Sequence, residues 1–422
     1  MVEALEVSVV LPCLNEAETV GSCVEKALRS LRELGVRGEV VVADNGSTDG
    51  SPEIAQAYGA RVIDAPVRGY GGALLAGITA ARGEKVIMAD ADDSYDLADL
   101  GPFIQALREG HDMVMGNRFA GGIAAGAMPA LHRYLGNPVL SWLGRALFGL
   151  KIRDFHCGIR GFHRTLVMAL GLCMPGMEFA SELVVRAQFA GHDIVEVSTR
   201  LFPDGRRTGR RHLRTWRDGW RHLRFLLVLA PRKTLIMPGS LLGVAGLVAT
   251  ALLATGSRQI GSVVFDVSAL VYACLALLVG VQLVLLGGVA KVYGSVERLV
   301  SPRQCARWVR VLRLEVGAVV GLALVTLGLV GTLAAVSNWK SVGFGALDAR
   351  QTIRLVVPSA TAIALGVLAA SFGLVGSLLT LRGVTPGEAM GLERTRLTED
   401  QLDLRTAAAT GQVGSRYGHS GR

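Results

Sequence analysis

The sequence predicts an α/β domain with a mostly parallel β-sheet, followed by a helical domain that crosses a membrane four times. Over the first 120 residues, apolar runs of strand length alternate with helical stretches. After residue 233 come four apolar stretches, each with the roughly 20 residues that a helix needs to cross the hydrocarbon core. A strongly basic segment lies between the two parts. A hydrophobic content of 50% and a mean hydropathy of +0.41 also exceed those of an ordinary soluble protein.

Five strands are expected in the first part, with helices between them. The strands are residues 6–12, 39–44, 61–64, 85–90 and 112–117, and the helices are residues 16–34, 51–59 and 70–83. Strands that alternate with helices are typical of a parallel sheet with both faces covered. In such sheets, ligands bind at the carboxyl ends of the strands.

Polar residues follow four of the expected strands. The strand ends read "PCLNE" (12–16), "DNGSTDGS" (44–51), "DADD" (90–93) and "GNR" (116–118). Each alone is typical of a strand stop, a turn or a helix cap. The glycine-rich "RGYGGAL" (68–74) is only a weak indication of a phosphate site. Four polar strand ends on one rim indicate a ligand-binding crevice.

The stretch "DADDSYD" (90–96) has four aspartates in seven positions. Carboxylate oxygens are ligands that Mg²⁺ prefers. An acidic cluster in a loop is often no more than a solvated turn, so these letters alone leave both interpretations open.

Three motifs together resemble a known family. "VVLPCLNE", "VVADNGSTDGS" and "MADADD" are similar to the nucleotide-sugar-binding half of glycosyltransferase family 2, which has the GT-A fold, and the resemblance covers residues 6 to about 230. It implies a nucleotide-sugar donor and a divalent cation, Mg²⁺ or Mn²⁺, on the donor's diphosphate. The donor-binding residues that it implies are Pro12, Leu14, Asn15, Glu16, Asp44, Asp90, Ala91 and Asp92.

The resemblance turns the acidic stretch into an expected metal site. Asp90, Asp92 and Ser94 are the expected metal residues, and Asp92 is also expected to be catalytic. Members of the family that act on lipid phosphates often have Gln at the position of Ser94. Asp93, Asp96 or water are therefore alternatives for the third ligand.

A second resemblance concerns the acceptor. The stretches 116–137, 154–164 ("DFHCGIRGFHR") and 177–187 ("MEFASELVVRA") look like polyprenyl-phosphate glycosyltransferases, the group of dolichyl-phosphate mannose and glucose synthases. Arg118 is then expected to be catalytic and to reach a phosphate. The expected acceptor-binding residues are Arg118, Arg133, Glu178, Arg206, Arg207 and Arg210. The alternative for Glu178, together with Glu182, is the polar face of a helix.

The segment 200–233 holds eleven Arg and Lys against two Asp, a local net charge of 11 − 2 = +9. Leu213, Trp216, Trp220, Leu223 and Leu227 recur in it at helical spacing. Tryptophans and arginines on one such helix are typical of the membrane interface. Nucleic-acid binding is the other use of a basic run, but its position just before the first span favours the membrane.

The expected spans are residues 234–256, 267–290, 315–336 and 355–381. The loop between spans two and three carries six Arg and Lys, whereas the loop between spans one and two has only Arg258. The positive-inside rule therefore places the α/β domain and both termini in the cytosol of a multi-pass cell-membrane protein. The amino terminus does not resemble a signal peptide, and the six cysteines are expected to be free thiols.

The expected domain bounds are 1–205 for the catalytic domain, 206–232 for the interfacial segment, 233–381 for the transmembrane domain and 382–422 for a polar, disordered tail. The expected reaction is inverting transfer of a hexose from a UDP- or GDP-sugar to polyprenyl or dolichyl phosphate at the cytosolic membrane face. One alternative is a processive polysaccharide synthase, because "QCARW" (304–308) matches Q-x-x-R-W. Another is a non-enzymatic membrane partner protein. A homo-oligomer is compatible with the sequence.

Overall fold

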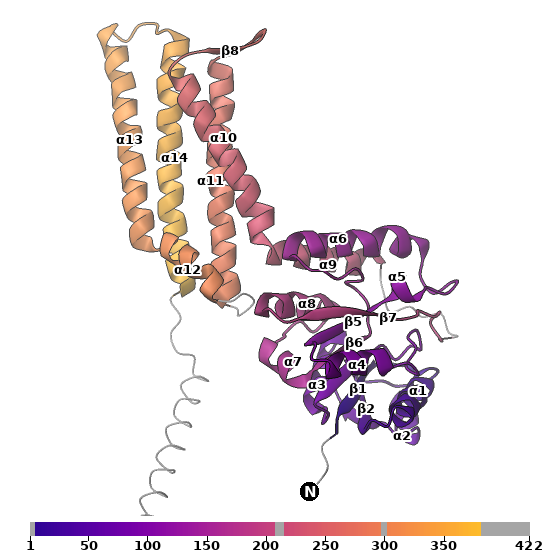
Figure 1. Cartoon of the computed structure of the whole chain (residues 1–422). Helices are drawn as coiled ribbons and strands as arrows, with labels where there is room; N and C mark the ends of the chain where they lie inside the picture. The colour runs from indigo at the N-terminus through magenta and orange to yellow at the C-terminus, as the bar shows by residue number, and fades with distance from the viewer. Residues whose placement is uncertain (1–4, 207–214, 297–301, 381–422) are drawn as a thin grey trace, which may run out of the picture.

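The computed structural model describes residues 5–206, 215–296 and 302–380. Figure 1 shows an α/β domain at one end and a bundle of long helices at the other, with α6 and α9 lying where the two meet. The fold class predicted from the sequence is confirmed.

A seven-stranded sheet forms the centre of the α/β domain, in the order β3-β2-β1-β4-β6-β5-β7. Its strands are β1 (Val7–Cys13), β2 (Gly38–Asp44), β3 (Arg61–Asp64), β4 (Lys85–Met88), β5 (Met113–Asn117), β6 (Arg160–His163) and β7 (Ile194–Ser198). All neighbours pair in parallel except β6, which runs antiparallel to both β4 and β5. The five expected strands are present, and β6 and β7 are additions that the sequence interpretation did not include.

Helices cover both faces of this sheet. They are α1 (Val20–Glu33), α2 (Ser51–Ala57), α3 (Tyr70–Ala80), α4 (Gly101–Arg108), α5 (Arg118–Gly121), η1 (His132–Gly136), α6 (Asn137–Phe148), α7 (Arg164–Leu170), α8 (Phe179–Ala190) and α9 (Thr215–Leu229). One half of the core lies between the sheet and α1 and α4. The other half lies under α3, α8 and α9, where Leu226 and Leu229 of α9 are buried with Phe179 of α8.

Four helices of the described chain are long and apolar enough to cross a membrane, namely Arg232–Ala254, Val267–Val296, Leu314–Ser341 and Ala349–Thr380. The first comprises η2 (Arg232–Ile236) and α10 (Met237–Ala254), and the others are α11, α13 and α14. Close backbone contact joins α10 to α11, because a Cβ on Gly280 would clash with the backbone of Gly243. The same holds for α13 and α14 at Gly321 and Gly366.

Two smaller elements lie at the ends of this bundle. The hairpin of β8 (Arg258–Ile260) and β9 (Val263–Phe265) lies at the end far from the α/β domain, and α12 (Pro302–Val311) lies at the near end (Figure 1). Within α12, the Trp308 ring packs against Gly288 of α11. The tail expected to be disordered, 382–422, lies outside the described residues.

Candidate active site

The loops after β1 and β2 are bonded to one another at the carboxyl edge of the sheet, where the sequence predicts a ligand-binding crevice. Asp44 is buried, and its carboxylate accepts hydrogen bonds from the backbone N–H groups of Gly46 (3.0 Å) and Ser47 (3.1 Å). Asn15 has a φ of 57°, and its Oδ1 accepts a hydrogen bond from the N–H of Thr48 (2.8 Å). These contacts hold the two loops together, so Asn15 and Asp44 lie on the same side of the crevice. Of the other expected donor residues, Pro12 lies within β1, Leu14 is exposed and Ala91 is buried.

Asp90 follows β4 and contacts Tyr70, the first residue of α3. Its Oδ1 accepts a hydrogen bond from the hydroxyl of Tyr70, at 2.8 Å. Burial raises the pKa of Asp90 above its usual value, and the charge of Asp92 raises it further. Positive charge nearby therefore favours the ionised form of Asp90.

Asp92 is held by its own loop. Its Oδ1 accepts hydrogen bonds from the backbone N–H (3.1 Å) and from the hydroxyl (2.6 Å) of Ser94. The hydroxyl of Ser94 thus orients Asp92. The carboxylate of Asp93 pairs with Lys26 of α1 at 2.7 Å. Asp96 accepts a hydrogen bond from the backbone N–H of Ala98.

Asp90 and Asp92 could together hold a divalent cation. The pKa of Asp90 is raised by the cost of burying its charge and by repulsion from Asp92, and a bound cation would offset both effects. Over the described ranges, no group of three or more His, Cys, Asp or Glu could hold a metal ion. The pair therefore fits a cation that takes its remaining ligands from the substrate or from water.

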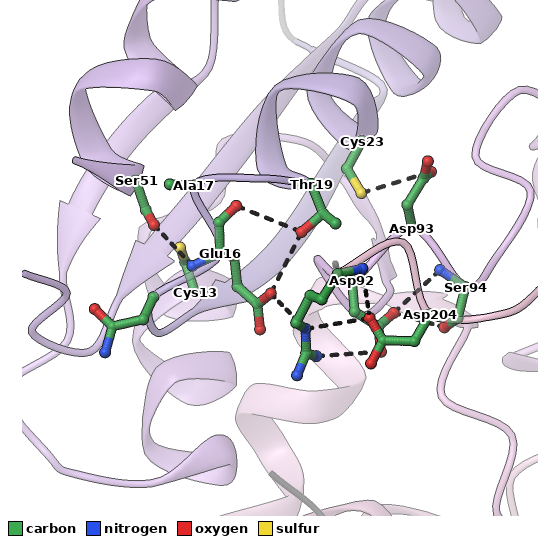
Figure 2. A network of polar contacts seen from close by, with 12 residues as sticks. Cys13, Glu16, Ala17, Thr19, Cys23, Ser51, Asp92, Asp93, Ser94 and Asp204 are labelled. Carbon is green, nitrogen blue, oxygen red and sulfur yellow. Dashed lines mark hydrogen bonds and ion pairs between the residues drawn. The ribbon is translucent and has the colours of Figure 1, made fainter. Parts of the chain in front are cut away.

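Arg206 contacts the loops that follow β1 and β4. Its Nε is 2.8 Å from Oε2 of Glu16, its Nη2 is 3.4 Å from Oδ2 of Asp92, and Asp204 also lies within reach at 3.3 Å. Figure 2 shows Glu16, Asp92 and Asp204 converging in this network. Burial raises the pKa of Glu16 to about 7, although the charge of Arg206 acts in the opposite direction. Arg207 and Arg210 lie outside the described residues.

Arg118 is buried in an ion pair. Its Nε and Nη2 each donate to a different carboxylate oxygen of Asp154, both at 2.7 Å, and its backbone N–H donates to the same side chain at 3.0 Å. The Asp154 side chain is fully buried. This bidentate pair fixes the Arg118 guanidinium near Asp90, whose pKa its charge lowers.

Two expected acceptor-side carboxylates have protein partners. Glu178 pairs with Arg221 of α9, whose Nε and Nη2 are 2.8 Å and 2.7 Å from its Oε1. Glu182 accepts hydrogen bonds from the backbone N–H groups of Cys173 and Met174 and pairs with Arg186 at 2.8 Å. Glu178 therefore links the α/β domain to α9, whereas Glu182 holds the turn before α8.

Arg133 lies apart from the crevice residues, on η1, where its guanidinium stacks over the ring of Tyr134. The surface of η1 and α6 is apolar, with side chains that recur at helical spacing on one face. The stripe consists of Leu131, Tyr134, Leu135, Val139 and Trp142, with exposed fractions of 41, 73, 55, 43 and 58%. Helices α6 and α9 pack together beside the membrane helices (Figure 1). Sequence reasoning missed this stripe, although its spacing is visible in "LHRYLGNPVLSW".

Sequence reasoning also missed three polar residues near Asp90, of which Tyr70 and His156 are partly buried. Tyr70 binds Asp90, Arg160 is fully buried, and His156 lies between Phe155 and His222. Arg160 and His156 belong to the stretch 154–164, which resembles polyprenyl-phosphate glycosyltransferases, but the sequence of that stretch does not show where their side chains lie.

Comparison with known proteins gives two family matches. The model for glycosyl transferase family 2 matches residues 8–171, and the model for the glycosyltransferase family 2 C-terminal transmembrane region matches residues 288–380. The low-salt glycan biosynthesis hexosyltransferase Agl6 of Haloferax volcanii is 37% identical over 374 residues, which are 88% of this chain and 88% of that protein.

Other matches cover about half of this chain or less. A dolichyl-phosphate hexose transferase of Haloferax volcanii is 34% identical over 46% of this chain and 81% of its own length. An undecaprenyl-phosphate 4-deoxy-4-formamido-L-arabinose transferase of Pectobacterium carotovorum is 30% identical over 40% of this chain and 51% of its own. The solved structure of glucosyl-3-phosphoglycerate synthase from Mycobacterium tuberculosis, in complex with Mn²⁺, uridine diphosphate and phosphoglyceric acid, is 25% identical. It covers 53% of this chain and 76% of that one, with a TM-score of 0.39.

Proposed function

This chain belongs to glycosyltransferase family 2, and we propose that it transfers a sugar from a nucleotide-sugar to polyprenyl phosphate at the membrane surface. That it is a membrane-embedded glycosyltransferase follows from its family and its four apolar helices. The non-enzymatic alternative is therefore wrong. The donor, the acceptor, the stereochemistry and the membrane face belong to the proposal.

The observation that carries the proposal is the double role of α9. Leu226 and Leu229 of α9 lie in the core of the catalytic domain, and Arg221 of α9 pairs with Glu178. The same helix leads within a few residues into the first membrane span, which starts at Arg232. This connection supports a candidate site that would lie at the membrane surface, where the polar head of a lipid could reach it. The relatives named for dolichyl-phosphate and undecaprenyl-phosphate transfer support this acceptor class.

For the donor we propose a UDP- or GDP-hexose. Asp44 and the loop from Leu14 to Glu16 would face the base and ribose, and Asp90 and Asp92 the diphosphate. Asp44 suits either base, because a carboxylate can accept a hydrogen bond from the N–H of uracil or of guanine.

Asp90 and Asp92 would hold Mg²⁺ or Mn²⁺, which when bound spreads the negative charge that develops on the departing diphosphate. Ser94 would orient Asp92 through its 2.6 Å hydrogen bond rather than serve as a principal ligand. Arg206 would add a second positive charge at the same edge, because it already contacts Asp92.

The acceptor needs no strong general base, because a phosphate monoester is already anionic at neutral pH. The protein would contribute position and charge. Arg118, fixed by Asp154, would lie beside the reacting groups and Arg206 would face the diphosphate, so replacing Arg118 should slow the chemical step. Direct attack by the phosphate oxygen inverts the anomeric carbon, and an α-linked donor would give a β-linked product.

For the membrane face we propose the cytosolic side, with residues 1–205, 206–232 and 233–381 as the catalytic, interfacial and transmembrane parts. The apolar stripe on η1 and α6 and the exposed Trp220 of α9 would lie in the headgroup region. Arg133 and the basic segment would lie near the lipid phosphates.

The processive-synthase alternative receives no structural support. Its motif lies in α12, where Trp308 packs on α11 at the end of the membrane bundle. Figure 1 shows α12 at the membrane bundle, apart from β1 and β2 of the α/β domain. A Q-x-x-R-W motif that serves a polymer's acceptor end would have to border the crevice.

The test is a transfer assay with purified full-length protein in detergent, Mg²⁺ or Mn²⁺ and a panel of UDP- and GDP-sugars. Polyprenyl phosphate is the acceptor, and the matching polyprenol without phosphate is the control. Mass spectrometry should find a glycolipid with the phosphate acceptor alone. Transfer to the polyprenol, or to neither acceptor with any donor of the panel, would contradict the proposal.

A further inference from the structure

The loop 154–158, which joins α6 to β6, lies directly against the proposed metal-binding carboxylate. The backbone N–H of Gly158 donates a hydrogen bond to the hydroxyl of Tyr95, at 2.7 Å. A Cβ on Gly158 would lie only 2.6 Å from Oδ2 of Asp90, so a larger residue here would displace the Asp90 carboxylate. At the other end of the loop, Asp154 holds Arg118. The loop thus connects both groups that are proposed to act on the substrates.

His156, in the middle of this loop, reaches α9. Its ring packs edge-to-face on His222, with 4.9 Å between ring centroids, and on Phe155, with 4.8 Å. His222 is fixed in turn, because its Nδ1 lies 2.9 Å from the hydroxyl of Ser181. His156 therefore lies between Asp90, where the donor's diphosphate is expected, and the helix that leads into the membrane.

Both ring nitrogens of His156 are buried and, within the described part of the chain, have no hydrogen-bond partner. Burial lowers the pKa of His156 well below its usual value, and the nearby His222, Arg160 and Arg118 lower it further. The neutral ring has one N–H donor and one acceptor nitrogen. Buried polar groups are almost always satisfied in folded proteins, so an unsatisfied one beside an active site indicates a ligand.

The surroundings of His156 favour an anion as that ligand. Arg160 is fully buried and donates to the backbone carbonyls of Cys157 (2.9 Å), Phe155 and Ala180. The described residues include no carboxylate paired with it. Arg118 pairs with Asp154, whereas Arg160 forms no ion pair within the described residues and adds buried positive charge near Asp90. Charge complementarity therefore selects a phosphate over a neutral sugar hydroxyl.

We propose that His156 is an acceptor-binding residue whose imidazole N–H donates a hydrogen bond to the phosphate of the lipid acceptor. This inference rests on the proposed function and assigns a residue to it. The residue as a whole is only partly buried, and the second side-chain torsion of histidine is broad. Rotation of the ring can therefore turn a nitrogen toward the incoming phosphate without unfolding the core.

The experiment measures binding of a short, water-soluble prenyl phosphate by isothermal titration, to full-length wild type and to two variants. His156→Phe keeps the aromatic packing and removes the donor, and His156→Gln keeps an N–H donor. We expect His156→Phe to weaken binding about tenfold or more, as for loss of a hydrogen bond to a charged group. His156→Gln should stay within about threefold of wild type, and UDP or GDP binding should be unchanged in both.

A control separates this role from general damage. His163→Phe alters a histidine at the end of β6 that pairs with Glu84, and both affinities should keep their wild-type values. His156→Leu replaces the phenylalanine variant if that variant does not fold. Wild-type affinity for the prenyl phosphate in His156→Phe or His156→Leu would overturn the inference while the proposed function stands. A wild-type protein that binds nucleotide but no prenyl phosphate would overturn both.

Discussion

Arg206 and Glu16 form an ion pair of 2.8 Å between Nε and Oε2, which joins the end of the catalytic domain to the loop after β1. The same guanidinium lies 3.4 Å from Asp92. Arg206 was expected to bind the acceptor because it begins the basic segment before the membrane. In the structure it contacts Glu16 and Asp92, which are proposed to hold the donor, and we therefore expect its replacement to affect donor binding.

Arg206→Gln should raise the donor KM by about tenfold, because the diphosphate would lose a charge-assisted contact. The measurement is steady-state kinetics with a short prenyl phosphate, varying the donor and the acceptor in turn. Arg200→Gln is the matched control, since Arg200 is exposed and stacks on Phe202. An unchanged donor KM together with a raised acceptor KM would show that Arg206 binds the acceptor, as expected from the sequence.

Glu16→Gln should change the pH dependence of stability. The pKa of Glu16 is about 7 in the folded protein, against 4.5 for an unperturbed carboxyl. Between these values the unfolded chain has released a proton that the folded chain retains, so wild-type stability falls as pH rises. Once the pH is above 7, the free energy of unfolding has fallen by roughly 3 kcal/mol because of this one group.

Glutamine at position 16 does not titrate, so this loss should be missing from the variant. Unfolding in detergent, followed by intrinsic fluorescence at about pH 5, 6, 7 and 8, should show Tm of Glu16→Gln rising relative to wild type with pH. Parallel Tm curves over that range would show that Glu16 ionises normally in the folded protein.

Asp92→Asn should lower kcat on the order of 100-fold or more, because the leaving diphosphate loses charge stabilisation worth several kcal/mol. Removal of divalent cations with EDTA should have a similar effect on wild type. Asp99→Asn is the control, as Asp99 is an exposed residue of the same loop. Undiminished turnover in EDTA would exclude a required cation.

The apolar stripe on η1 and α6 should matter only when the acceptor is in a bilayer. Replacing Leu135 and Trp142 together by Ser should reduce transfer to long-chain polyprenyl phosphate in vesicles several-fold, because burial of these side chains in the interface would be lost. Transfer to the short soluble acceptor should stay at the wild-type rate. Equal losses in both assays would mean that the stripe serves the fold of the domain rather than the membrane.

Much of the fold was predictable because its signals are local. Apolar runs followed by Asp44 and by Asp90 identify buried strands and their polar ends, and four long apolar stretches identify the membrane helices. Strand β6 was not predictable in the same way. It has four residues and contains Arg160, whose charge argues against a core strand until its hydrogen bonds to backbone carbonyls are seen.

The polar residues at the carboxyl ends of the strands could be located from the sequence, but their pairings could not. Arg118 forms an ion pair with Asp154, Lys26 with Asp93 and Arg206 with Glu16. Each pair joins residues far apart in the sequence, so neighbouring letters carry no information about it. The unsatisfied nitrogens of His156 were equally hidden, since burial depends on α9 folding back onto the domain.

The most direct test of the central claim is the chemical identity of the product. Purified protein is incubated with polyprenyl phosphate and the donor selected from the panel, and the lipid is analysed by mass spectrometry and ³¹P NMR. The proposed function predicts addition of one sugar and conversion of the phosphate monoester to a diester, both lost in Asp92→Asn. A product with the sugar on another atom, or a chain of several sugars, would contradict it.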